Sequence, residues 1–498
     1  MIKLKKVAII LFVILFLLSI SPLIAREISV KASPTIWTVD ASLNDTIQEA
    51  INNASSGDTV FVRKGIYQEN IVVSKSLLLI GEDIESTWIW GYGNDSVIWI
   101  TANGVNITGF TVKGSGLNPY DSAIRIENSN GVVIAYNKIT ESTNGISLNS
   151  SNNNAILSNT IFNNEINGVY LLSSSGNVFS GNTISNNFQG VYLFSSSGNV
   201  FFGNTISNSF LGVYFTFSSD NLFYCNNFRN TNQVTSGLTN FWNFSSEGNY
   251  WSDYTGQDLN RNGIGDTPYV IDLNNQDNYP LMGMFWSFNV TWKKETYYLN
   301  FVSNSTIYGF TFKIGAETGN KIIRFNVSGE EGTAGFCRIM IPTAFMDYPF
   351  VVLIDEEDVT STLLGVSNET YSYIYFSYPF SSHNITIISS DLLHLYSELF
   401  DRYLKLQMDL YDLNMSYEEL LSIYNILLGN YTMLQERYDE LNASYQEHLF
   451  EYSENLQDIQ NLTYVFAGTT AIFLITTIYL SQRAHSRTIT KSKEFESK

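Results

Sequence analysis

The sequence predicts an all-β fold, in which a right-handed parallel β-helix is followed by a β-sandwich, a coiled-coil helix and a C-terminal transmembrane helix. Three observations predict it: a 22-residue repeat in the first half, alternating strands after residue 285, and a seven-residue repeat near the C terminus. The predicted parts are a signal peptide (1–25), a parallel β-helix (36–283) with a capping helix near 44–54, an immunoglobulin-like β-sandwich (285–390), a coiled-coil stalk (391–463), a transmembrane helix (464–480) and a basic cytoplasmic tail (481–498).

The 22-residue repeat is marked by glycines at positions 145, 168, 190 and 212 and by a column of asparagines in the same step. Short β-branched and aromatic runs between Asn, Gly and Ser turns, at this period, indicate one repeat per coil of a parallel β-helix. Stacked Asn side chains would hydrogen-bond from coil to coil. Strand alternation predicts the core residues Val169, Leu171, Val191, Leu193, Val213 and Phe215, and the asparagine column is Asn137, Asn159, Asn182, Asn204 and Asn226.

A short helix is predicted before the repeats. The segment "NDTIQEAINNA" has helical spacing, with Asn44 or Asp45 as the N-cap. The first coil of a β-helix exposes core and strand edges that such a helix would cover.

An apolar run lies near each end of the chain. Three lysines precede "VAIILFVILFLLSI", which is typical of a secretory signal, and an uncleaved N-terminal anchor is the alternative. The run "YVFAGTTAIFLITTIYL" is followed by a basic tail, which favours a membrane span with a cytoplasmic C terminus. Asn-X-Ser/Thr sequons occur from Asn44 to Asn461 and none lies in the tail. We therefore expect a single-pass cell-surface glycoprotein with a large extracellular part.

Composition excludes two classes. The net charge of −20 argues against a nucleic-acid partner. With only two cysteines in 498 residues, the chain has no disulfide framework.

The opening "TIQEAI…GDTVFVRKGIYQENIVVSKSLLLIGE", the "GNTISNN" coils and the closing "NYWSDYTGQDLNRNGIGDTPYVIDLNNQDNYPLM" together resemble the NosD-type parallel β-helix proteins of the pectin-lyase fold, particularly archaeal cell-surface ones. The resemblance covers about residues 36 to 283. It implies the fold, but not one activity, since related β-helices include polysaccharide lyases, hydrolases, a periplasmic copper-maturation protein and surface proteins. A copper role is not expected, because all four histidines lie beyond the β-helix.

No catalytic residues are predicted. A hydrolase on this scaffold needs converging carboxylates, yet Glu165 is the only charged residue between Glu141 and Asp220. A polysaccharide lyase or glycoside hydrolase remains the alternative if carboxylates converge in the early coils, near Asp95, Asp121, Glu127 and Glu141.

Tyr170, Tyr192 and Tyr214 fall in one outward register. Exposed rings in a row could stack on sugar rings, which makes these tyrosines the predicted carbohydrate-binding residues. The alternatives are that they stack on one another or lie under the following domain.

The segment "DLNRNGIGD" places oxygen ligands at Asp258, Asn260, Asn262 and Asp266, with Gly263 at the sharp turn. This is the start of a calcium loop. Because position twelve is a tyrosine and not a glutamate, it predicts a weak structural calcium site, with a plain turn as the alternative.

A heptad pattern follows, with tyrosines at position a from Tyr396 to Tyr452 and leucines at position d from Leu399 to Leu441. Ten such repeats predict a coiled-coil stalk about 100 Å long through which the chain self-associates. The seam weakens at His448 and Asn455. Gly429 allows a folded-back hairpin, although the unbroken phase favours one continuous helix.

We therefore predict a membrane-anchored cell-surface protein that binds glycans or envelope polysaccharide, or serves as a structural spacer, without acting as an enzyme.

Overall fold

The computed structural model describes residues 34–316, 319–329, 334–379, 382–389, 392–430, 444–457 and 459–464. The predicted signal peptide, basic tail and, apart from Tyr464, transmembrane helix lie outside these ranges. Among the helices within them, none is long and apolar enough to cross a membrane.

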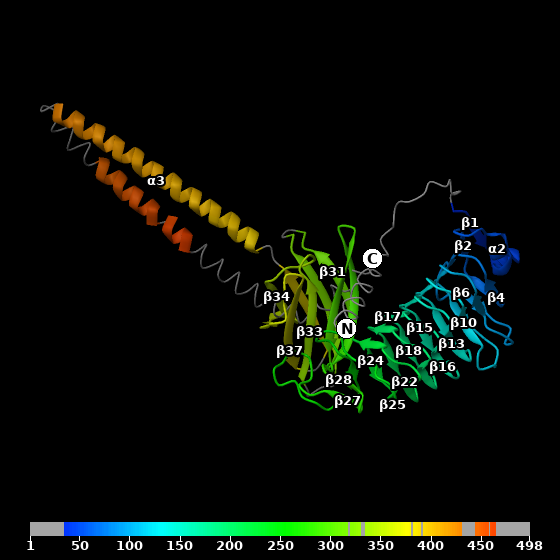
Figure 1. Ribbon diagram of the computed structural model, residues 1–498. Helices are drawn as coiled ribbons and strands as arrows, with labels where there is room; N and C mark the ends of the chain where they lie inside the picture. The colour runs from blue at the N-terminus through cyan, green and yellow to red at the C-terminus, as the bar shows by residue number, and fades with distance from the viewer. Residues whose placement is uncertain are drawn as a thin grey trace, which may run out of the picture.

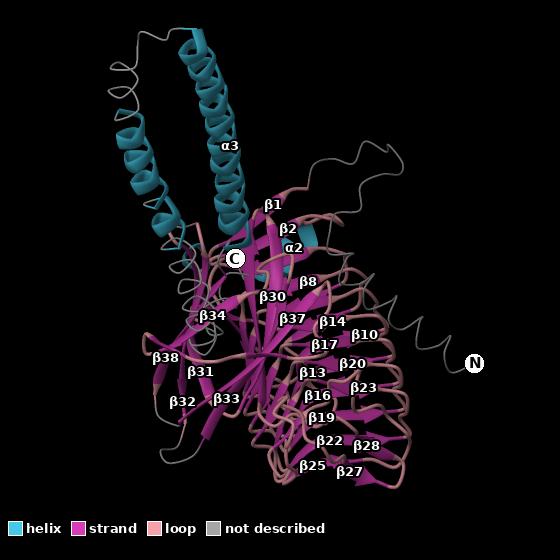
Figure 2. Ribbon diagram, turned by 90° about the vertical axis from the view of Figure 1, so that its left-hand side faces the viewer, coloured by secondary structure: helices cyan, strands magenta, loops and turns pink. Residues whose placement is uncertain are grey.

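Residues 36–251 form a right-handed parallel β-helix of about ten coils, whose strands stack into three sheets (Figures 1 and 2). Sheet A contains β1 Ile36–Val39, β2 Thr59–Val62, β5 Leu78–Gly81, β8 Asn106–Thr108, β11 Val133–Ala135, β14 Ala155–Leu157, β17 Val178–Ser180, β20 Val200–Phe202 and β23 Leu222–Tyr224. Sheet B contains β3 Gly65–Gln68, β6 Thr87–Trp90, β9 Thr111–Lys113, β12 Lys138–Thr140, β15 Thr160–Phe162, β18 Thr183–Ser185, β21 Thr205–Ser207, β24 Asn227–Arg229 and β26 Tyr250–Trp251. Sheet C contains β4 Ile71–Val73, β7 Ile98–Ile100, β10 Ser122–Glu127, β13 Asn144–Asn149, β16 Asn167–Leu172, β19 Gln189–Phe194, β22 Leu211–Thr216 and β25 Asn232–Thr235.

The predicted core is confirmed. All six predicted inward residues are buried, and each pairs with its repeat mate in a neighbouring coil, as Val169 does with Val191. Toward the C-terminal end the core becomes aromatic, and Phe179, Phe201 and Phe223 stack with ring centroids 4.5 and 4.4 Å apart.

The predicted asparagine column forms a hydrogen-bonded ladder. Each backbone N–H donates to the Oδ1 of the next asparagine, as Asn182 does to Asn204 at 3.0 Å. A second ladder, which the sequence analysis missed, runs through the turn before sheet A. Because these amides are buried, the ladders satisfy backbone groups that no water reaches. The second ladder consists of Asn154, Asn177, Asn199, Asn221 and Asn240.

The predicted capping helix is present as α2 Ile47–Asn53, after a short 3-10 turn η1 Ala41–Leu43. The N-cap prediction was wrong: Thr46, with extended backbone, accepts from the Glu49 N–H, whereas Asn44 adopts a left-handed conformation that ends η1. Ile47 and Ile51 are fully buried against the first coil.

A buried carboxylate ends the first ladder. Asp277, on the short hairpin β27 Tyr269–Asp272 and β28 Asn275–Asp277, accepts from Asn249 N at 2.6 Å and Trp251 Nε1 at 2.9 Å. Burial raises the pKa of this carboxyl to about 6. The tryptophans Trp242 and Trp251 close the aromatic core beside it.

Two antiparallel five-stranded sheets share a second core and form the β-sandwich. One sheet contains β29 Met284–Trp292, β30 Glu295–Ser303, β33 Ala334–Pro342, β37 Tyr371–Pro379 and β36 Thr362–Leu363. The other contains β31 Thr306–Ile314, β32 Lys321–Ser328, β38 His383–Ser389, β34 Phe350–Ile354 and β35 Glu357–Asp358.

The sandwich is joined to the last coils by apolar and ionic contacts. Phe285 packs against Phe202 and exchanges two backbone hydrogen bonds with the Asn227 amide. Arg338, almost fully buried, makes a bidentate ion pair with Glu247, with N–O distances of 2.6 and 2.9 Å. These contacts lie on sheets A and B, so sheet C keeps its own surface.

The heptad region corrects the prediction of one continuous helix. Helix α3 Leu392–Asn430 is antiparallel to further helical residues at 444–457 and 459–464, called here the second helix (Figure 1). Tyr417 stacks on Tyr445 with centroids 5.6 Å apart, whereas 28 residues of one helix would separate them by about 42 Å. The predicted stalk of about 100 Å is therefore a folded-back pair, and self-association stays a prediction.

The hairpin also explains why the seam weakened. The contact stripe of the second helix follows positions a and e. Its partly buried residues are Tyr445, Leu449, Tyr452, Leu456 and Thr463. The d residues His448 and Asn455 of that helix are exposed. On α3 the partly buried residues Leu410, Tyr417 and Leu421 also occupy positions a and e, so both helices meet through the same heptad positions.

Candidate functional site

The predicted tyrosine column lies on the outer face of sheet C. Strand pairing places Tyr170 beside Tyr192 and Tyr192 beside Tyr214. Their rings stack, with centroids 5.2 and 4.9 Å apart and planes within 22°. The faces of neighbouring rings therefore cover each other, and the column presents ring edges and hydroxyl groups to the outside.

The hydroxyl groups of this column are hydrogen-bonding groups. Burial raises the pKa of Tyr170 to about 12, so its O–H stays protonated at physiological pH. The Tyr192 hydroxyl donates to Thr216 Oγ1 at 3.3 Å. All three side chains are half-buried, and the described contacts of the sandwich fall on other sheets.

More exposed rings stand at the turn before sheet C. Phe188 and Phe210 are 53% and 55% exposed and stack with centroids 5.3 Å apart. Tyr120, in the long turn before β10, is 58% exposed and close enough to Tyr170 to influence its ionisation. We call Tyr120, Tyr170, Phe188, Tyr192, Phe210 and Tyr214 the aromatic edge.

The two phenylalanines were not among the predicted binding residues. Their signal was available, because "NNFQG" and "NSFLG" place Phe188 and Phe210 in the same 22-residue register as the tyrosines. They lie in a turn, where strand alternation does not predict which side chain points outward.

Strand register places Asp95 beside Asp121 in neighbouring coils, whereas Glu127 and Glu141 lie on different sheets. Glu127 pairs with Arg125 at 2.8 Å on sheet C, and Glu141 pairs with Lys113 at 2.8 Å on sheet B. Asp95 accepts from the following N–H, and Asp121 accepts from Asn118 N within its own loop. These carboxylates serve local ion pairs and turns.

The basic side chains near them are also engaged. The Lys113 ammonium lies 5.1 and 4.5 Å from the ring centroids of Trp88 and Trp90. The Arg125 guanidinium lies 5.2 Å from the ring centroid of Trp99. A lyase base must be an uncharged amine or guanidine that accepts a proton from the substrate, whereas both of these side chains form ion pairs with carboxylates.

The predicted calcium loop lies at the junction with the sandwich. Asp258 accepts from the N–H groups of Asn262 and Gly263 at 3.0 and 2.8 Å. Asp266 accepts from Leu259 N and from the Asn260 amide. The four predicted ligands thus lie in one loop. Side-chain oxygens of Asp258, Asn262 and Asp266 already accept internal hydrogen bonds, as in a turn, and Asn260 donates one.

Gly263 shows what this loop contacts. Its φ is +79°, and a Cβ at this position would lie 2.8 Å from Arg338 Cδ. The loop is therefore seated on the arginine that joins the two domains. Within the described part of the chain, no group of three or more His, Cys, Asp or Glu side chains is arranged to hold a metal ion.

Comparisons with known proteins agree with this architecture. Residues 51–256 match the family model "Periplasmic copper-binding protein (NosD)". The matched segment covers most of the β-helix. No curated protein matches the chain.

Solved structures that resemble this chain include two lyases and a tailspike protein. Pectate lyase Pel9A is 14% identical, with a TM-score of 0.33, over 44% of this chain and 70% of its own. An alginate lyase from Paenibacillus sp. is 14% identical, with a TM-score of 0.28, over 43% and 97%. The Dettilon tailspike protein is 13% identical, with a TM-score of 0.33, over 69% and 90%. Sequence identities and TM-scores this low carry no argument about function.

Proposed function

We propose that this protein is a cell-surface β-helix protein whose aromatic edge binds extracellular polysaccharide or glycans without cleaving them. The observation that carries the proposal is the pair Phe188 and Phe210, whose rings are more than half exposed beside the tyrosine hydroxyls of sheet C. Apolar ring surface next to hydroxyl groups suits a sugar, which has an apolar face and a polar rim.

The regular step of the edge supports an extended ligand. Tyr170, Tyr192 and Tyr214 repeat their hydroxyl groups once per coil, about 5 Å apart. A chain of linked sugars would meet the same chemistry at each coil, and the weak contacts would add along the chain.

The alternative, a polysaccharide lyase or hydrolase, has less support. A glycosidase needs two carboxylates facing one bond, and the four early-coil acids take separate partners in the described residues.

A copper function, suggested by the family description, does not fit the residues of the matched segment. Residues 51–256 contain no histidine or methionine, and their one cysteine, Cys225, is buried. Copper is bound in proteins mainly by imidazole, thiolate and thioether groups.

The remaining parts of the proposal rest on the sequence. The apolar termini support secretion and a single C-terminal membrane anchor, and the sequons support N-glycosylation. A weak calcium site in the loop of Asp258 and Asp266 remains part of the proposal as a structural role.

A glycan and polysaccharide array with the purified full-length protein, with and without calcium, tests this function. We expect Phe188→Ala with Phe210→Ala to abolish binding, and the triple alanine variant of Tyr170, Tyr192 and Tyr214 to weaken it. The matched control is Tyr136→Ala, an exposed ring at the turn between sheets A and B. Absence of any bound glycan would favour a structural spacer, and release of sugar products would establish an enzyme.

A further inference from the structure

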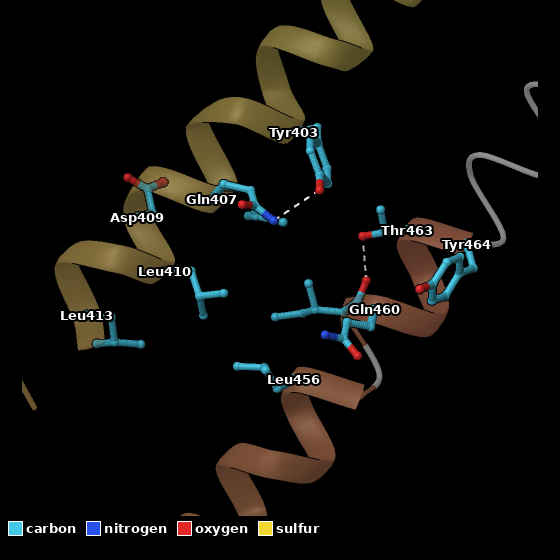
Figure 3. A pocket seen from close by; sticks show the side chains of 11 residues that line it. Tyr403, Gln407, Asp409, Leu410, Leu413, Leu456, Gln460, Thr463 and Tyr464 are labelled. Atoms are coloured by element: carbon cyan, nitrogen blue, oxygen red, sulfur yellow. Dashed lines mark hydrogen bonds between the residues drawn. The ribbon is translucent and has the colours of Figure 1, made fainter. Parts of the chain in front are cut away.

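Helix α3 carries leucines that the second helix leaves uncovered. Leu406, Leu413 and Leu420 stand seven residues apart and are 48%, 55% and 66% exposed. Leu406 and Leu413 border a groove of about 370 Å³ between the helices, together with Leu410 and Leu456 (Figure 3). The side chains at position a of α3 pack against the second helix. The leucines at position d lie beside this contact and stay exposed.

Two antiparallel helices alone cannot bury two apolar stripes. Helical pairs of this kind become stable when further helices cover the remaining stripe, as in four-helix bundles. An exposed row of leucines therefore marks an association surface. We propose that a second copy of this chain docks on the groove, so that two helical hairpins form an antiparallel four-helix bundle.

The leucine spacing fits a copy of itself. A two-fold axis at Leu413 sets this residue against its own copy and sets Leu406 against Leu420. Equal seven-residue steps make both halves of the contact identical, which an unrelated partner would not require.

The flanking positions also accept a second copy. In the two-fold arrangement the positions beside the leucine stripe are g and c: Asp409 lies opposite Ser416, Lys405 lies opposite Glu419, and Asp412 faces its own copy. Two attractive Lys–Glu pairs thus flank a single pair of like charges, and this charge pattern suits a second copy of the chain. A glycan on Asn414 would block the contact, so we expect this sequon to be unoccupied in the associated protein.

Cysteine crosslinking of the full chain tests the arrangement. Both native cysteines are buried, so crosslinking reports the introduced thiols. We expect Leu413→Cys to give a covalent dimer on mild oxidation, and separately tagged Leu406→Cys and Leu420→Cys chains to crosslink to each other. Leu404→Cys, on the opposite face of α3 and 43% exposed, is the matched control and should stay monomeric.

Three outcomes would overturn the proposal: no covalent dimer at any of these positions, equal crosslinking of Leu404→Cys, or efficient crosslinking of Leu406→Cys to itself, which indicates parallel helices. Light scattering provides a second measurement, in which Leu413→Glu should halve the mass of the particle with an unchanged circular dichroism spectrum. The leucine stripe of α3 is separate from the aromatic edge of the β-helix. The outcome of the glycan-binding experiment therefore does not depend on whether the chain dimerises.

Discussion

Replacing the buried Asp277 by asparagine should remove a specific pH dependence of stability. The pKa of this carboxyl is about 6 in the folded protein, compared with 3.8 in the unfolded chain. Below pH 3.8 the Asp277 carboxyl is protonated in both the folded and the unfolded protein. As the pH rises from about 4 to 6, the unfolded chain loses its proton first, so the folded state loses relative stability.

The size of this loss follows from the shift. About two pKa units, at 1.36 kcal/mol each, give about 3 kcal/mol between pH 4 and pH 7. In Asp277→Asn this contribution should be absent. The variant also loses one acceptor, because its amide nitrogen meets the Tyr279 N–H, which costs about 1 kcal/mol at all pH values.

The assay is urea unfolding at several pH values, followed by tryptophan fluorescence, since Trp251 donates to Asp277. Other carboxylates also titrate, but they are common to both proteins and cancel in the difference. Glu165→Gln, an exposed change in the same β-helix, is the control and should follow the wild type. Equal pH dependence of Asp277→Asn and wild type would refute the reasoning.

Four further changes test the architecture. Asn204→Ala leaves the Asn182 N–H and the Phe179 carbonyl without their partners, and it should cost roughly 3 kcal/mol of unfolding free energy by urea titration; a loss below 1 kcal/mol would contradict the ladder. Glu247→Ala strands the buried Arg338 and should cost about 3–5 kcal/mol, whereas a double change to apolar residues should restore most of it, and no restoration would argue against a buried pair. Asp258→Asn should lower the thermal midpoint equally in calcium and in EDTA if the loop acts as a turn, whereas a larger effect in calcium would indicate a bound ion. Burial raises the pKa of Asp358 to about 9 and neither oxygen has a hydrogen-bond partner in the described structure, so Asp358→Asn should be more stable than wild type at pH 8 and not at pH 4; equal stability at both would contradict this.

The β-helix could be predicted closely because every 22-residue repeat forms the same buried strand contacts and the same turn hydrogen bonds. In each coil, alternation selects the buried residue and the turn asparagine finds its copy one repeat away, so Val191 and Asn182 were assigned correctly without coordinates. The N-cap was missed by one or two residues because Asn44, Asp45 and Thr46 all have capping side chains, and backbone conformation decides among them.

The aromatic edge was predicted in part. Sequence register placed Tyr170 and Tyr192 outward, but it could not show that their faces would close on each other. Phe188 was missed because it lies in a turn. The role of Arg338 as the joint between domains depends on Glu247, 91 residues away, and no local pattern reports such a contact.

The heptad region shows the limit of periodicity. A seven-residue repeat selects a helix face and says little about whether the helix continues, because an antiparallel partner uses the same stripe. The stacking of Tyr417 on Tyr445 settles the direction of the chain.

Because the second helix runs antiparallel to α3, it shortens the distance between the β-sandwich and the C-terminal end of the hairpin. Helix α3 is 39 residues long, or about 58 Å, yet Tyr464 borders the same groove as Tyr403, near the end where α3 leaves the sandwich. The first and last described parts of the helical hairpin therefore lie close together. An anchor following residue 464 would hold the sandwich at short range, and the hairpin would extend as a side arm that sets spacing between molecules and adds nothing to their height.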